Sequence, residues 1–104
     1  MRLRDVGHSR SGDKGTVANI SLVAFDESDY PRLVRLVTAE RVKRHFAGVI
    51  SGDVVRYELP TLGALNFVLS GVVGGGVTRT LALDAHGKSL SSLLLDMEIS
   101  DDDR

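Results

Sequence analysis

The stretch VANISLVAF, residues 17–25, decides the fold class of this chain. Apolar and polar residues alternate along it, with Ala18, Ile20, Leu22 and Ala24 on one face and Asn19 and Ser21 on the other. A period of two is the pattern of a β-strand that buries one face and leaves the other facing polar surroundings. We therefore predict a sheet with one face packed in the core.

A helical stretch follows, and its pattern predicts two short helices rather than one. Asp29 is a candidate cap and Pro31 lies in the first turn. The apolar residues of the two halves point more than about 90° apart, so one straight helix cannot bury both. They are Leu33, Leu36 and Val37 in the first half and Ala39, Val42 and Phe46 in the second. Thr38 is predicted to cap the second helix, which ends at Gly48.

The remaining elements are assigned on either side of this centre. Before it, we predict a short strand over residues 2–6 and a loop over residues 7–16. After it, residues 54–60 alternate as a strand that Pro60 stops. Thr61 is predicted to cap a helix over residues 62–73, and a strand over 64–70 is the alternative. A hairpin turning at Asp84–Gly87 and a strand over 92–99 complete the chain.

This order of elements predicts a single α+β domain over residues 1–104. Its natural solution is a two-layer sandwich, with an antiparallel or mixed sheet and the helices on one face. Ferredoxin-like topology is the leading candidate.

Composition excludes several classes of function. The 104 residues include no cysteine, so no disulfide, iron–sulfur cluster or thiolate nucleophile is expected. A net charge of −1, no Trp and only three Phe argue against nucleic-acid binding. The uncharged window 59–78 is interrupted by five Gly and one Pro, so we expect no membrane span. The N-terminus lacks the apolar core of a signal peptide, and we expect a cytoplasmic protein.

The densest polar segment is HSRSGDKGT, residues 8–16. It differs from a nucleotide-binding P-loop because Asp13 interrupts the run, Gly15 separates Lys14 from Thr16, and a strand pattern follows. Two interpretations stay open. Gly12 and Gly15 let backbone N–H groups turn inward around an anion, with Arg10 and Lys14 supplying charge. Alternatively the segment is a structural loop in which Asp13 binds its own turn or a neighbouring cation.

Other constellations are weaker. The three histidines show no metal-ligand spacing, so no metal or cofactor is predicted. The basic residues of the helical region are interpreted as a solvated face, and an RNA-binding surface is a third alternative. The predicted 62–73 helix carries no charge on any side and must be covered all round, either within the chain or by another subunit.

Four motifs carry a family resemblance. HSRSGDKGTVANI, TAERVKRHFAG, YELPTLGALNFVL and GGGVTRTLALDAHGKSL occur in order over about residues 4–99. Together they resemble the C-terminal domain of the AtuA-like proteins, the acyclic terpene utilisation family. The resemblance implies a ferredoxin-like fold, here as a stand-alone version of a domain that follows a much larger one. It also implies a place in the catabolism of terpenoid or branched acids as CoA thioesters.

Two functions follow from the resemblance and the residues together. In the first, the chain is an accessory subunit that docks on a larger AtuA-type protein, or on copies of itself, through the uncharged 62–76 region. In the second, it is a small enzyme or binding protein acting alone on an anionic small molecule. The predicted site is the same for both: the family motif at His8, Arg10, Ser11, Gly12, Asp13, Lys14 and Gly15, with Asn19, Asn66 and Arg79 as further lining residues.

Overall fold

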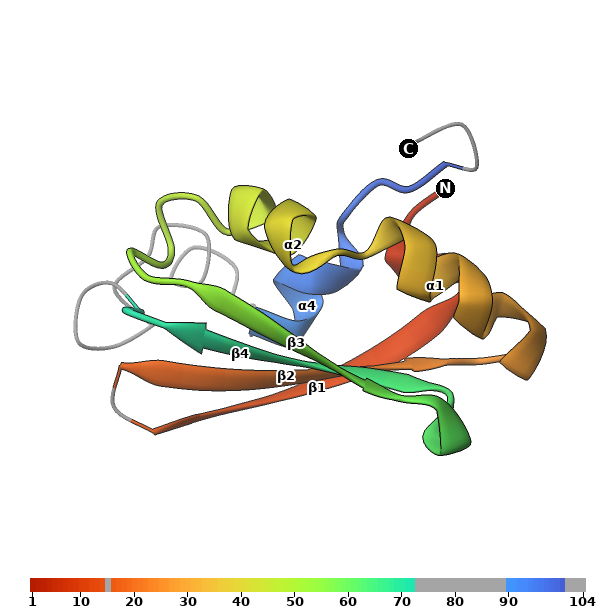
Figure 1. The fold of residues 1–104 in the computed structure, drawn as a ribbon. Coiled ribbons are helices and arrows are strands. Elements are labelled where there is room, and N and C mark those ends of the chain that lie inside the picture. Colours follow the sequence, from red (N-terminus) through yellow and green to blue (C-terminus); the bar gives the residue numbers. More distant parts are fainter. Residues whose placement is uncertain (15, 73–89, 101–104) are drawn as a thin grey trace.

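The computed structural model describes residues 1–14, 16–72 and 90–100. Four strands form one antiparallel sheet in the order β1-β2-β4-β3. They are β1 (Gly7–Lys14), β2 (Val17–Ala24), β3 (Val54–Leu59) and β4 (Ala64–Ser70). The helices α1 (Tyr30–Leu36), α2 (Ala39–His45) and α4 (Leu90–Leu95) all lie on one side of this sheet (Figure 1). Short 3-10 turns occupy Leu3–Asp5, Glu27–Asp29 and Pro60–Leu62.

The predicted fold class is confirmed. The chain is an α+β domain with an antiparallel sheet and helices on one face, consistent with a ferredoxin-like fold. The core lies between the two layers. Its largest fully buried side chains come from both of them: Phe46, Phe67, Leu3, Ile20, Leu22, Leu33, Leu36, Leu65, Leu69, Leu94, Ile99 and Val37.

The break between the two central helices is also confirmed. Thr38 separates α1 from α2, and its hydroxyl accepts the backbone N–H of Arg41 at 3.1 Å, which caps α2 as predicted. Asp29 occupies the cap position of α1 but makes no capping bond with its side chain. Asp26 instead accepts the N–H of Ser28 at 3.0 Å and caps the preceding 3-10 turn. Helix α2 ends at His45, three residues before the predicted Gly48.

The prediction of a loop over residues 7–16 is wrong for most of its length. Residues 7–14 form β1, which pairs with β2 from Gly7 opposite Ala24 to Lys14 opposite Val17. Glycine and charge indicated a loop, but β1 is an edge strand with a neighbour on one side only. Such a strand tolerates polar and charged residues because it is not enclosed by the sheet.

The helix predicted over 62–73 is wrong, and the alternative strand over 64–70 is confirmed. β4 lies between β2 and β3, so its backbone is paired on both sides. Leu65, Phe67 and Leu69 point into the core and are fully buried. A central strand carries no charge because it is enclosed by its neighbours, and its leucines coincided with a helical spacing. Gly63, with φ of 60°, turns the chain into β4.

Both ends of the chain differ from the prediction. Residues 2–6 hold a 3-10 turn instead of a strand, and only Arg2 forms a bridge, to Glu98. The strand predicted over 92–99 is wrong for residues 92–95, which belong to α4, where Leu90 and Leu94 are buried four residues apart, at helical spacing. Of residues 96–99, only Glu98 makes a β-bridge, to Arg2. The alternation was misleading because tertiary packing of this segment against β1 decides its conformation. The hairpin turn predicted at Asp84–Gly87 lies outside the described residues.

Within the described residues, no helix is long and apolar enough to cross a membrane. The uncharged window that raised the question contains the central strand β4.

Candidate functional site

The side of the sheet that faces away from the helices is the candidate site, and we call it the open face. No helix among the described residues covers it (Figure 1). Residues paired across antiparallel strands point to the same side, so the register defines its members. They are the positions of His8, Arg10, Gly12 and Lys14 from β1, Val17, Asn19, Ser21 and Val23 from β2, Ala64, Asn66, Val68 and Ser70 from β4, and Val55, Tyr57 and Leu59 from β3.

Large apolar side chains are exposed on this face and at its rim. Val55, Tyr57 and Leu59 of β3 are 47%, 53% and 39% exposed. At one end of the face, where Val23 pairs with Ala64, Phe25 follows β2 and Leu62 lies in the turn between β3 and β4, with 63% and 68% exposed. Apart from Val17 on the same face and Met1, these are the exposed large hydrophobic residues of the described chain. Exposed apolar surface is therefore concentrated on one side of the sheet.

The open face brings together five predicted residues whose surroundings the structure describes: His8, Arg10, Gly12, Asn19 and Asn66. Arg10, Ser21, Asn66 and Tyr57 form one row across all four strands, through the pairs Arg10–Ser21, Ser21–Asn66 and Asn66–Tyr57. Gly12 and Asn19 are paired in the next row, and His8 lies in the row on the other side. The five predicted residues come from three strands, β1, β2 and β4, yet the sheet places them on one surface.

The other predicted residues are not all brought to this surface. Ser11 points to the helix layer, where its hydroxyl accepts the N–H of Ser91 at 3.3 Å. Asp13 and Lys14 occupy the last two positions of β1, with Asp13 opposite Ala18 on the helix side and Lys14 opposite Val17 on the open-face side, and their side chains lie outside the described part of the structure. Gly15 and Arg79 also lie outside the described residues. Gly12 is in a regular strand opposite Asn19, so it does not form the turn that an anion-binding nest requires.

The charge of the open face is one-sided. Its strand positions include His8, Arg10 and Lys14 but no Asp or Glu. Among the described residues, the guanidinium of Arg10 has no hydrogen-bond or ion-pair partner. The ring of His8 stacks on Phe25 with 5.7 Å between ring centroids, which joins the polar edge of the face to its apolar rim. No three His, Asp or Glu side chains gather as a metal site in the described part of the chain.

Comparison with protein families matches the AtuA ferredoxin-like domain model to residues 1–100. The chain belongs to the AtuA ferredoxin-like domain family. No curated protein and no solved structure matches it.

Sequence reasoning about this AtuA ferredoxin-like domain missed its exposed apolar residues. The alternation of Val55, Tyr57 and Leu59 was recognised as a strand pattern, but nothing indicated that this apolar set faces away from the core. The orientation of β3 is shown by Arg56, which lies between these apolar residues in the sequence. Its side chain is only 18% exposed, and Nη1 donates to the carbonyls of Val34 and Val37 at 2.7 and 2.9 Å, at the end of α1. The polar set of β3 therefore faces the helices.

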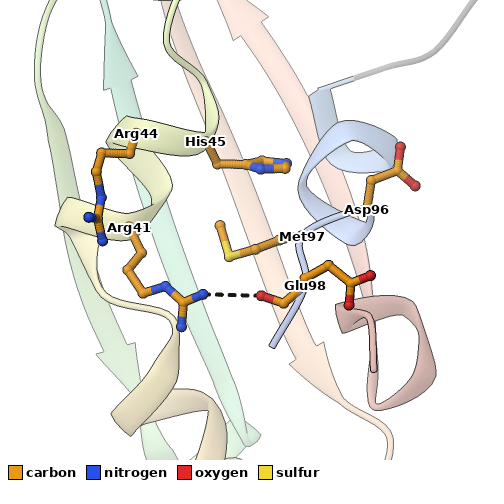
Figure 2. A pocket seen from close by; sticks show the side chains of 6 residues that line it. All are labelled: Arg41, Arg44, His45, Asp96, Met97 and Glu98. Carbon is orange, nitrogen blue, oxygen red and sulfur yellow. Dashed lines mark hydrogen bonds between the residues drawn. The ribbon is translucent and has the colours of Figure 1, made fainter. Parts of the chain in front are cut away.

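A second candidate region is the α2 groove, between α2 and residues 96–98 (Figure 2). It is a cavity of about 420 Å³ lined by Arg41, Arg44, His45, Asp96, Met97 and Glu98. Arg41 and His45 come from the helix and face residues 96–98, with Met97 between them (Figure 2). By volume and charge it resembles a ligand pocket more than the open face does.

The charged groups of the α2 groove are largely engaged within the chain. Arg41 donates to the carbonyls of Leu36 and Glu98 at 3.2 and 3.1 Å. The Nε2 atom of His45 lies 2.6 Å from the carbonyl oxygen of Leu93. The groove's hydrogen bonds therefore hold α2 against the C-terminal segment.

The two carboxylates of the groove serve a similar structural purpose. Asp96 forms ion pairs with Arg2 and Arg4, and Glu98 with Arg2 and the N-terminal amine. Their side chains point away from α2 (Figure 2). They join the two ends of the chain, and of the charged side chains only the exposed Arg44 is left over for a ligand.

Proposed function

We propose that this AtuA ferredoxin-like domain is an accessory binding subunit that docks on a larger AtuA-type protein through its open face. The observation that carries the proposal is the gathering, on one side of the sheet, of exposed apolar side chains and of Arg10, whose guanidinium has no partner among the residues that the structure describes. The family resemblance supports a role in cytoplasmic catabolism of terpenoid or branched acyl-CoA compounds.

The physical argument is the free energy of exposed apolar surface. Removing it from water contributes about 25 cal/mol per Å². A contiguous apolar patch with a polar margin marks an interaction surface more often than scattered single residues do. Val55, Tyr57 and Leu59 form such a patch on β3, with Phe25 and Leu62 at the end of the face where Leu59 pairs with Ala64. The 62–76 region contributes to docking through the outward residues of β4, because Leu65, Phe67 and Leu69 are already buried within the chain.

The second candidate function is binding of a small anion by the chain alone, as an enzyme or a ligand carrier. The observation in its favour is the same unpartnered Arg10, with His8 beside it and the amides of Asn19 and Asn66 on the neighbouring strands. A guanidinium supplies charge-assisted hydrogen bonds to a carboxylate or phosphate, and amide groups fix its orientation. The apolar half of the face has no role in this candidate function.

Titration calorimetry with a purified larger AtuA-type protein tests the docking proposal. Wild-type chain is expected to bind, and Tyr57→Asp is expected to weaken binding by at least about thirtyfold, as for a hot-spot residue of about 2 kcal/mol. Ala47→Asp adds the same charge at an exposed position after α2, outside the sheet, and should bind like wild type. Equal loss in both variants, or no binding by wild type, would contradict docking through this face.

The same instrument separates the second candidate. Inorganic phosphate or acetate is titrated into the chain alone, and Arg10→Gln is compared with wild type. Saturable binding that Arg10→Gln abolishes and Tyr57→Asp leaves unchanged would favour the small-anion function over docking.

A further inference from the structure

The open face has two chemically different halves. The β1 half presents His8 and Arg10 and no apolar strand residue, whereas the β3 half presents Val55, Tyr57 and Leu59. Between them lie small or polar residues of β2 and β4, including Ser21 and Asn66. A partner that covers the whole face must therefore satisfy a cation at one edge and apolar side chains at the other.

The cation sets a strict condition on that partner. Covering Arg10 removes its guanidinium from water, and a buried charge without a counter-charge is strongly unfavourable. None of the strand positions on the open face is Asp or Glu, so no carboxylate of the face itself lies ready to pair with it. The compensating carboxylate must come from the partner.

This condition argues against a second copy of the chain as the occupant. Two open faces stacked on each other would bring two unpaired arginines and no strand-borne carboxylate into one interface. The acidic residues in the described strands, Asp13 and Glu58, stand at positions on the helix side of the sheet. Charge complementarity therefore favours a different protein with an acidic group in its interface.

The spacing of the two halves adds a geometric condition. Arg10 and Tyr57 stand at opposite ends of one row across the sheet, three strand spacings apart. Because neighbouring strands lie about 4.8 Å apart, the two backbone positions are roughly 14 Å apart. A partner with one carboxylate and one apolar contact at this separation can bind in one orientation only.

We infer that the open face takes a protein partner presenting a carboxylate to Arg10 and, roughly 14 Å away, an apolar patch to Val55, Tyr57 and Leu59. The inference rests on the proposed docking function and specifies its partner. Apolar contact supplies most of the affinity, and the charge pair sets orientation and the rate of association.

The test uses the full chain and a purified larger AtuA-type protein, with affinity measured at 50 and 300 mM NaCl. Arg10→Glu is expected to weaken binding by at least about tenfold at low salt, because it places like charges together. Arg10→Gln should weaken it less and should remove most of the salt dependence of wild type. Arg44→Glu, an equal charge change at an exposed position of the helix layer, is the matched control and should bind within twofold of wild type.

The outcomes separate this inference from the proposed function. If wild type does not bind at all, the docking function fails. If Tyr57→Asp abolishes binding but Arg10→Glu and salt have no effect, docking stands and the acidic partner is wrong. If sedimentation of the chain alone shows a dimer that Tyr57→Asp dissociates, a second copy is the occupant and the inference is overturned.

Discussion

The open face and the α2 groove differ in shape, in charge and in how far their polar groups are already bonded within the chain. The groove is the more hollow and the more charged of the two, with a cavity of about 420 Å³. The open face is a sheet surface with a set of exposed apolar side chains and Arg10, which is unpaired within the described ranges 1–14, 16–72 and 90–100. On shape alone the groove would be chosen as the site.

The difference lies in what remains unsatisfied. In the groove, Arg41 and His45 bind backbone carbonyls. Asp96 and Glu98 form ion pairs with the side chains of Arg4 and Arg2, near the start of the chain. Ligand binding there would have to compete with these contacts. On the open face, Arg10 and Tyr57 have exposed surface that a partner can cover without breaking any bond of the fold. For this reason we place the proposed binding surface on the open face and not in the groove.

The largest expected effect contrasts the two sides of the sheet. Phe67→Ala removes a fully buried ring from β4 and should lower the free energy of unfolding by about 3–5 kcal/mol. Tyr57→Ala, on the open face, should change it by less than about 0.5 kcal/mol, because the ring is 53% exposed in the chain alone. Urea unfolding measures both. A comparable loss for Tyr57→Ala would mean that the open face is covered within the chain.

An intermediate effect is expected in the α2 groove. Arg41→Ala removes charge-assisted hydrogen bonds to the carbonyls of Leu36 and Glu98 and should cost about 1–3 kcal/mol in urea unfolding. Arg44→Ala and Arg10→Ala should each stay within about 0.5 kcal/mol of wild type, since both side chains are exposed. If Arg41→Ala is neutral for stability, the groove is not a structural clamp and becomes the stronger ligand site.

The smallest effect concerns a surface ion pair on the helix side. Lys43 donates to Asp53 at 2.9 Å, and this bond holds the pKa of Asp53 below its ordinary value of 3.8. Because the folded pKa is depressed, the contribution to stability is present above pH 3.8 and is lost as pH falls through the folded pKa. The pair is exposed, so its contribution is small at neutral pH.

A comparison of wild type with Lys43→Met by urea unfolding at pH 7 and pH 2.5 checks this sign. Any advantage of wild type at pH 7 should be smaller at pH 2.5, below the ordinary pKa of 3.8. Binding through the open face should be the same for both proteins at pH 7, and a weaker Lys43→Met would show that the two regions are coupled.

Sequence patterns predicted those parts of the fold whose signal is local. Alternation located β2 and β3, and the change of apolar direction at Thr38 located the break between α1 and α2. Residues 7–14, 64–70 and 90–95 were misassigned because their neighbours decide their structure. β1 lies at an edge and can be polar, β4 is enclosed and can be uncharged throughout, and α4 is held by packing on β1.

The residues of the candidate site could likewise be predicted from the sequence only in part. Chemical type marked His8, Arg10, Asn19 and Asn66 as candidates, but could not place them together or separate Ser11 from them. Their convergence follows from the pairing of β1 with β2 and of β2 with β4. The apolar half was missed because alternation defines two faces of a strand without indicating which one is buried.

By itself, the amino-acid sequence determined the fold class, the family, the central helix break and most of the polar residues of the site, since each depends on residues close together in the chain. Tertiary structure alone decided which side of the sheet the helices cover. That choice depends on contacts between distant segments, such as Arg56 with the end of α1, and it leaves Arg10 and Tyr57 on the same uncovered surface.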